Sequence, residues 1–241
     1  MDLSDLNQLK RDRRAIRHLL SPTDPVDALT SYYALWHDPQ RTQLMVHHEA
    51  TGRADGFVAV CMTGTDLFRP LVTLRAPDER VAGELLRAAL APNRPYQVIV
   101  PVTAASLVRA HIDVSSSRLA QIYRLDPSQF EPVINVLVQR VVSDEGIPRF
   151  QIESQGKVVA MAGTNWRSPS FAEVFVYVHA SGRGRGWGKS VVSACTVELL
   201  ESRLKPLYMV EEDNEASVRI AESLGYRNIG HSEFAAEGRI K

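Results

Sequence analysis

The feature that most constrains the fold is an apolar strand that enters a helix through a glycine-rich loop. Residues 171–179 read Phe-Ala-Glu-Val-Phe-Val-Tyr-Val-His, and these aromatic and β-branched side chains predict a strand. Glycine follows at every second position from Gly182 to Gly188, and an apolar stretch then predicts a helix over residues 186–203. Strands that alternate with helices in this way are typical of an α/β fold with a mixed sheet.

Both halves of the chain carry nearly the same order of predicted elements. The first half is predicted to contain a helix, a hairpin, a strand, a helix, a strand and a helix at residues 5–20, 43–60, 71–74, 79–90, 97–102 and 104–111. The second half is predicted to contain a strand at 122–125, a helix at 127–141, a hairpin at 150–162, a strand at 171–179, a helix at 186–203, a strand at 206–211 and a helix at 216–224. We interpret this order as a tandem duplication, with one α/β (α+β) domain in residues 1–117 and another in residues 118–241. The alternative is that any α/β chain yields such an order under loose assignment.

Composition argues against several classes of protein. The chain has 28 basic and 28 acidic residues and 44% hydrophobic residues, which is typical of a globular protein and gives no sign of a nucleic acid or a membrane as partner. Since no apolar run approaches the ~20 residues of a membrane span, we expect a cytoplasmic protein. We expect it to be either a monomer or a homodimer. Cys61 and Cys195 form no metal-binding pair, so both are predicted to be buried and no metal is expected.

The loop from Ser181 to Ser190 has the chemistry of an anion-binding site. Its glycines allow backbone N–H groups to approach a ligand closely, and the start of the following helix adds unpaired donors and a partial positive charge. Arg183, Arg185 and Lys189 add full charges that can pair with a pyrophosphate.

Three phosphate-binding patterns compete for this loop. A nucleotide P-loop requires glycine where the chain has Arg183, and a dinucleotide-binding pattern requires glycine where it has Lys189. The pattern that fits is R-x-x-G-x-G, from Arg183 to Gly188. A flexible basic turn on the surface is the remaining alternative.

Together with residues 171–179 and this loop, the motifs Asn-Glu-Ala-Ser at 214–217 and Leu-Gly-Tyr at 224–226 resemble the acetyl-CoA-binding core of the GNAT acetyltransferases. The resemblance covers residues 120–240. The loop in the corresponding place of the first half, residues 75–80, has no glycine. The first half therefore resembles the degenerate domain of tandem GNAT proteins, which is not expected to bind coenzyme A.

The resemblance implies an acyltransferase that uses acetyl-CoA as co-substrate, in which an acceptor amine attacks the thioester directly. It places the pyrophosphate on the N–H groups of residues 183–189 and the pantetheine arm beside the strand at 176–178, where the N–H of Val178 can stabilise an oxyanion. The residues expected to bind the co-substrate are Val176, Tyr177, Val178, Arg183, Gly184, Arg185, Gly186, Trp187, Gly188, Lys189, Ser190, Asn214 and Ser217. Within this set, Trp187 either covers the loop by packing or stacks on the adenine, and Asn214 also suits a helix N-cap.

Glu173 is the candidate general base, and Tyr177 and His179 are further acid or base candidates. Each also has a structural alternative: Glu173 as a solvated or salt-bridged carboxylate, Tyr177 as a packed ring and His179 as a cap of the loop. Many relatives carry a tyrosine where this chain has Ala221, so a non-catalytic acyl-CoA-binding or regulatory module stays open as the second hypothesis. The expected partner is a small-molecule or peptide amine.

Overall fold

The computed structural model describes residues 3–64, 66–143 and 146–241, and these form two compact units. Unit 1 comprises residues 1–120 and 231–241, and unit 2 comprises residues 121–230. Both units have a mixed α/β architecture, in agreement with the predicted fold class. The predicted domain boundary at 117/118 places residues 231–241 in the second half of the chain. In the structure these residues complete the sheet of unit 1.

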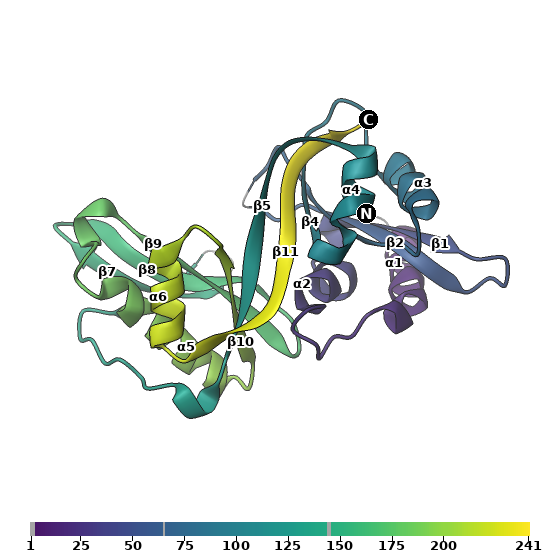
Figure 1. Ribbon diagram of the computed structural model, residues 1–241. Coiled ribbons are helices and arrows are strands. Elements are labelled where there is room, and N and C mark those ends of the chain that lie inside the picture. The colour runs from purple at the N-terminus through teal and green to yellow at the C-terminus, as the bar shows by residue number, and fades with distance from the viewer. Residues whose placement is uncertain (1–2, 65, 144–145) are drawn as a thin grey trace. The chain divides into compact units, whose positions relative to one another are not determined.

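Unit 1 is a sheet with the strand order β1-β2-β3-β4-β11-β5 (Figure 1). β1, β2 and β3 pair antiparallel, β3 and β4 pair parallel, and β11 pairs antiparallel with β4. The helices and strands of this unit are α1 (Leu3–Ala15), α2 (Ala28–Ser31), β1 (Thr42–His48), β2 (Ala54–Cys61), β3 (Leu71–Arg75), α3 (Glu79–Ala89), β4 (Tyr96–Pro101), α4 (Ala105–His111), and parts of β5 (Ile112–Leu125) and β11 (Tyr226–Ile240). A π-helix, η2 (Tyr32–Trp36), and the 3-10 turns η1 (Arg17–Leu19), η3 (Pro39–Arg41) and η4 (Val102–Ala104) connect them.

Unit 2 is a sheet with the strand order β5-β10-β9-β8-β7-β6, of which β9 and β10 are parallel. Its elements are the end of β5, η5 (Pro127–Gln129), β6 (Gln139–Val142), β7 (Pro148–Ser154), β8 (Lys157–Arg167), β9 (Phe171–Val178), η6 (Ala180–Gly182), α5 (Trp187–Glu201), β10 (Lys205–Glu211), α6 (Glu215–Ser223) and the start of β11. Most of these elements lie within a few residues of the predicted ones.

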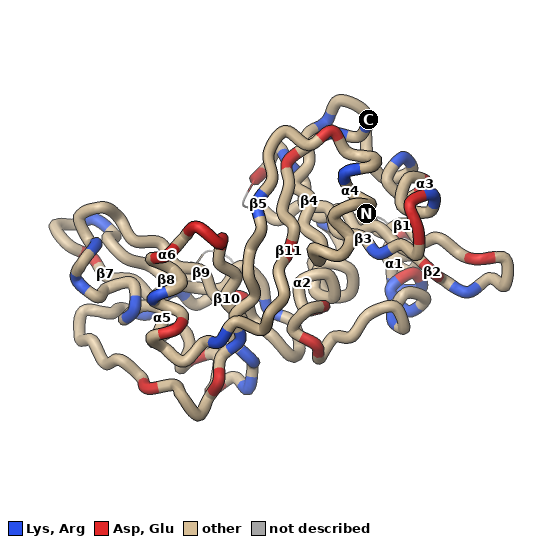
Figure 2. Tube along the Cα trace, in the orientation of Figure 1, with Lys and Arg blue, Asp and Glu red and all other residues tan. Residues whose placement is uncertain are grey.

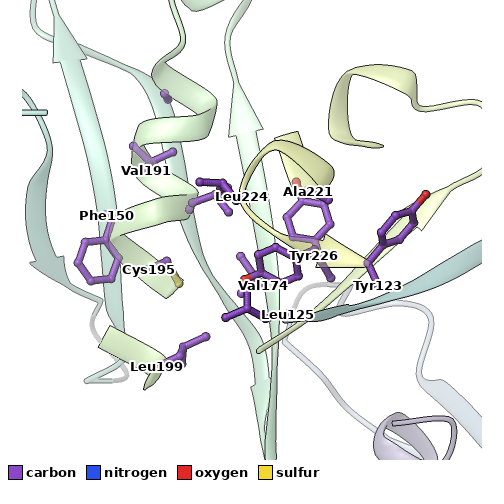
Figure 3. Close-up of a cluster of buried hydrophobic side chains, with 14 of the residues drawn as sticks. Tyr123, Leu125, Phe150, Val174, Val191, Cys195, Leu199, Ala221, Leu224 and Tyr226 are labelled. Atoms are coloured by element: carbon purple, nitrogen blue, oxygen red, sulfur yellow. The ribbon is translucent and has the colours of Figure 1, made fainter. Parts of the chain in front are cut away.

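The core of unit 2 lies between this sheet and α5. Figure 3 shows Val191, Cys195 and Leu199 of α5 in the same cluster as Leu224 and Tyr226, all with less than 1% of their surface exposed. Because the apolar residues of α5 recur on one side of the helix, that side packs on the sheet. This packing holds the N-terminus of α5 at the end of β9.

The helix predicted over residues 127–141 is wrong. Only the 3-10 turn η5 forms, followed by an irregular segment at 130–138 and then by β6. Pro132 has no N–H and its ring clashes with a preceding helical turn. The segment is held on α5 instead, because the Val133 N–H donates to Ser193 Oγ at 2.8 Å and the Asn135 amide donates to Ser190 Oγ at 3.1 Å.

The long strand β11 was not predicted, because its sequence lacks the alternation of a half-buried strand. Four consecutive residues, 233–236, are buried. Gly238 lies where an added Cβ would be 2.5 Å from the carbonyl oxygen of Asp113, so glycine there allows the backbone of β5 to approach closely. β11 pairs with β4, and Phe234 lies opposite Val100. The segment is therefore ordered by contacts with residues that are far away in the sequence.

Candidate functional site

Two parallel strands of unit 2 pair over only part of their length. β9 and β10 pair from Phe171 and Lys205 to Val174 and Tyr208, where the pairing ends. Both strands continue, β9 to Val178 and β10 to Glu211. We call the end of the pairing at Val174 and Tyr208 the fork. Beyond it, no residue of β9 up to Val178 is paired with β10 in the described register, and we call this unpaired side of β9 the gap. An extended ligand can bind to an unpaired strand side as an additional strand.

The register with β8 shows which backbone groups point into this gap. Val178 lies opposite Ala160, and the N–H of His179 donates to the carbonyl oxygen of Val159 at 2.9 Å. Because hydrogen-bonded residues alternate along an antiparallel pair, Tyr177 also directs its N–H and C=O toward β8. Val176 and Val178 therefore direct theirs away from β8, into the gap.

The loop after β9 is shaped by two glycines in the left-handed region. Gly184 has φ 72° and Gly186 has φ 73°, and a Cβ on either would meet no atom within 4 Å. Conformation rather than crowding therefore favours glycine at both positions.

The N-terminus of α5 has the donors of an anion site. Its N-cap is Gly186, and among the described residues no side chain accepts a hydrogen bond from its first turn. By contrast, Asp78 caps α3 of unit 1 by accepting from the Val81 N–H at 2.8 Å. The first-half loop thus places a carboxylate where an anion would bind, which supports the prediction that it does not hold a pyrophosphate.

Gly188 allows three elements to meet behind the loop. A Cβ at this position would lie 2.9 Å from both Val178 Cγ2 and Ile220 Cδ1, so α5 approaches β9 and α6 more closely than a larger residue permits. This contact holds the N-terminus of α5 beside the end of β9.

We expect Gly188→Ala to lower the free energy of unfolding by about 1–3 kcal/mol, as overpacking does. In the double variant with Ile220→Val, which lacks the Cδ1 atom, part of that loss should return. Denaturant unfolding of the two single variants and the double variant measures the coupling. Strict additivity of the two losses would contradict the close contact.

The three predicted cations lie along the loop and the start of α5. Arg183 and Arg185 are exposed and Lys189 is half-buried. The Arg185 guanidinium lies 4.9 Å from the centroid of the Trp187 ring, which is itself half-buried against the core. Trp187 therefore packs as a cover of the loop and also supports Arg185.

Ser190 faces the protein interior. Its side chain is buried, donates to the Gly186 carbonyl oxygen at 3.2 Å and accepts from Asn135. Its hydroxyl thus supports the loop from behind.

At the start of α6, Asn214 is the N-cap and accepts from the Ser217 N–H at 3.1 Å. Ser217 itself is half-buried in the first turn.

Glu173 lies on the face of the sheet opposite α5, together with Phe175 and Tyr177, because side chains alternate along β9. Its carboxylate accepts from the Asn165 amide at 3.0 Å. Asn165 reaches it from a β-bulge, since the register of β8 with β9 shifts between Thr164 and Trp166. Burial raises the pKa of Glu173 to about 7, and the hydrogen bond from Asn165 opposes this shift.

The other two acid or base candidates differ in their surroundings. Tyr177 is 49% exposed and lies on the Glu173 face, so it is accessible to a ligand. His179 Nδ1 lies 2.9 Å from Ser181 Oγ and accepts from the Ser181 N–H at 3.3 Å. This histidine caps η6, as its structural alternative predicted.

Sequence reasoning missed Asn165, Asn135 and Tyr208. The two asparagines act through a bulge and an irregular segment that have no periodic pattern. Tyr208 lies in a strand that was predicted, but its place at the fork depends on where the pairing with β9 ends.

Both cysteines are buried, as predicted, and burial raises the pKa of each thiol to about 12. Within residues 3–64, 66–143 and 146–241, the structure has no helix with the length and apolar character needed to cross a membrane. In the same ranges, no group of three or more His, Cys, Asp or Glu side chains is arranged to hold a metal ion. Basic and acidic residues are interspersed along both units (Figure 2).

Comparisons with known proteins agree with the fold and with the loop. Residues 148–233 match the family model of the GNAT acetyltransferases. No curated protein matches the chain in sequence.

Solved structures match over nearly the whole chain. A GNAT-family acetyltransferase from Colwellia psychrerythraea is 14% identical, with a TM-score of 0.59 and coverage of 99% of this chain and 98% of that one. A Drosophila protein is 11% identical, with a TM-score of 0.69 and 96% coverage of both chains. A tandem GNAT protein from the clavulanic acid biosynthesis pathway is 14% identical, with a TM-score of 0.59 and coverage of 99% and 95%.

The two units together have a fold like that of the tandem GNAT protein. Residues 148–233 thus match the GNAT acetyltransferase family, and the fold of the chain is similar to that of GNAT proteins.

Proposed function

We propose that unit 2 transfers an acetyl or similar acyl group from acyl-CoA to an amine, by direct attack of the amine on the thioester. The observation that carries this proposal is the gap beside β9, because it leads from the fork to a loop with an uncapped helix N-terminus. An extended pantetheine arm suits the gap and a pyrophosphate suits the loop. The thioester then lies beside β9.

The loop supports phosphate binding by several independent means. The left-handed glycines Gly184 and Gly186 expose backbone N–H groups, and the first turn of α5 adds its own donors. Arg183, Arg185 and Lys189 supply charge.

Val176 and Val178 direct N–H groups toward the proposed arm. A strand N–H in this position can pair with the pantetheine amides or stabilise the oxyanion that forms when nitrogen attacks the carbonyl carbon. We assign the oxyanion role to Val178, as the resemblance implied.

Glu173 is the proposed base. An alkyl ammonium has a pKa of about 10.4, so a neutral amine at pH 7 costs about 4.6 kcal/mol, and a carboxylate that accepts the proton as the C–N bond forms lowers this cost. A pKa of about 7 suits the role, because a base is most effective when its pKa is near the working pH. The exposed Tyr177 ring shares the face of Glu173, and we propose that the acceptor, a small-molecule or peptide amine, approaches on this face.

Calorimetric titration with acetyl-CoA and with ATP tests the binding step. We expect the full chain to bind acetyl-CoA and not ATP. Arg183→Ala should weaken acetyl-CoA binding by about tenfold, the loss of one charge-assisted hydrogen bond, and added salt should reduce the difference. Arg124→Ala, at an exposed arginine of β5, is the matched control and should bind like the parent. Equal affinities of the two variants would argue against the loop as the phosphate site.

A non-catalytic acyl-CoA-binding module is the second candidate. It is favoured by Ala221, whose side chain is fully buried in the core and offers no acid at a position where many relatives have a tyrosine. Thiol release from acetyl-CoA across a panel of amines separates the candidates, since a module binds without turnover.

A further inference from the structure

The face of unit 2 that carries Glu173 has a row of three residues across β7, β8 and β9. Phe175 of β9 lies opposite Gly163 of β8. A Cβ on Gly163 would lie 2.9 Å from Phe175 Cε1 and 3.3 Å from Arg149 Cγ, so the ring and the arginine stem converge over this glycine from the two neighbouring strands. Because Gly163 has no side chain, the two groups can meet above β8.

The charge of Arg149 is available to a ligand. Its side chain is exposed. The described ion pairs of unit 2 join Arg140 to Glu198 and Arg219 to Glu215, and no carboxylate among the described residues pairs with Arg149. A guanidinium presents a planar fork of donors that matches a carboxylate with two hydrogen bonds. Arg149 can therefore bind an anionic group.

The two ends of this face suit an amine and an anion. Glu173, the proposed base, lies two residues before Phe175 on β9 and can accept a proton from an amine at one end. Two strand spacings are about 10 Å and two residues along a strand are about 7 Å, so the Cα atoms of Glu173 and Arg149 are about 12 Å apart. The half-buried Phe175 ring lies between them and offers an apolar surface.

We propose that the acceptor is an amine that carries a carboxylate across an apolar body, and that Arg149 selects it. This inference rests on the proposed function. The amine binds beside Glu173, the apolar part lies on Phe175, and the carboxylate binds the Arg149 guanidinium. An extended peptide rises about 3.3 Å per residue, so a peptide of about three residues with both ends free has the required span.

The carboxylate of the acceptor takes no part in the chemical step. The nitrogen lone pair forms the C–N bond, the C–S bonding pair leaves on sulfur, and the amine proton passes to Glu173 and then to solvent. Arg149 is thus a specificity-determining residue, because it binds the acceptor far from the reacting atoms.

Thiol release from acetyl-CoA with the full chain tests this selectivity on two probes that differ in one charge. The probes are the tripeptide glycyl-phenylalanyl-glycine and its C-terminal amide. The parent should acylate the free acid with a kcat/KM about tenfold higher than that of the amide, the effect of a hydrogen bond to a charged group. The difference should lie in KM, because the carboxylate is bound equally in the ground state and the transition state.

Variants of Arg149 assign the preference to its side chain. Arg149→Ala should raise KM for the free acid to that of the amide and leave both kcat values unchanged. Arg149→Lys keeps the charge without the fork and should retain part of the preference. Arg140→Ala is the matched control and should retain all of it. Arg140 lies on the neighbouring strand β6, opposite Phe150, and pairs with Glu198 of α5, which covers the other face.

Gly163→Ala tests the geometry without a change of charge. The added methyl group displaces the Phe175 ring and the Arg149 stem, so the preference for the free acid should fall. The acetyl-CoA affinity, measured by calorimetry, should stay at the parent value, because α5 and its loop lie on the other face. A full preference in Gly163→Ala would contradict the role of this row.

The outcomes distinguish the inference from the function on which it rests. If the parent acylates the two probes equally, or acylates only amines that lack a carboxylate, selection by Arg149 is overturned while the proposed function stands. An undiminished preference in Arg149→Ala leads to the same conclusion. If the parent acylates no amine, the proposed function and the inference are both overturned.

Discussion

Glu173→Gln is expected to lower kcat/KM for amine acylation by about 10²–10⁴, the typical contribution of a positioned base. Glutamine keeps the shape of the side chain and can still interact with Asn165, but it cannot accept the amine proton. The acetyl-CoA affinity should be unchanged, because the carboxylate lies on the face of β9 opposite α5.

The pH profile of the parent should report the same group. Burial raises the pKa of Glu173 to about 7, so kcat should fall below pH 7 as the base is protonated and should level off above it. This inflection should be absent in Glu173→Gln. Glu153→Gln on β7, at an exposed carboxylate, is the control and should keep both the rate and the inflection.

Stability provides a second measurement of the same pKa. Since the folded pKa of about 7 is above the unfolded value of 4.5, the folded state binds the proton more tightly, and the stability that this provides is lost as the pH rises from 4.5 through 7. Glu173→Gln should therefore gain stability relative to the parent between pH 5 and pH 8. A constant difference across that interval would show that the carboxyl is not perturbed.

Val178→Pro should reduce transfer by about 10²–10³, the usual effect of removing one oxyanion donor. Proline removes the N–H that points into the gap, while the β8 ladder uses Tyr177 and His179 instead. The chain should therefore still fold, as edge positions of a strand tolerate proline where the N–H has no partner strand.

Two further variants make this result interpretable. Val178→Ala trims the same side chain but keeps the N–H, so it should retain transfer and show only the stability cost of lost packing. Tyr177→Pro removes an N–H that points toward β8 and should destabilise the fold. If Val178→Pro folds and is as active as Val178→Ala, the N–H has no part in the reaction.

The sequence predicted most elements because their patterns are local. The β9 strand, the glycine loop and α5 follow from side-chain alternation, glycine spacing and apolar periodicity. The prediction of a helix over 127–141 is wrong because it followed the apolar pattern and neglected Pro132, which does not fit inside a helix. β11 was missed because its order depends on pairing with β4, which lies far away in sequence.

The sequence predicted those parts of the candidate site whose chemistry follows from the residue type. It did not predict the parts that depend on the register of the strands. The loop from Arg183 to Gly188 and the N-cap Asn214 were identified by spacing. The position of Tyr208 at the fork became clear only once the end of the β9–β10 pairing was known. Ser190 has a suitable residue type, but its hydroxyl faces Asn135, a contact that no local pattern predicts.

The assignment of residues 231–241 to unit 1 has a consequence for the order of folding during synthesis. The ribosome releases the chain from its N-terminus, so β4 emerges long before its neighbour β11. Until synthesis reaches the final strand, unit 1 has an open sheet edge at β4, and such edges are prone to pair with other chains. Unit 2, which is contiguous in sequence, can form first.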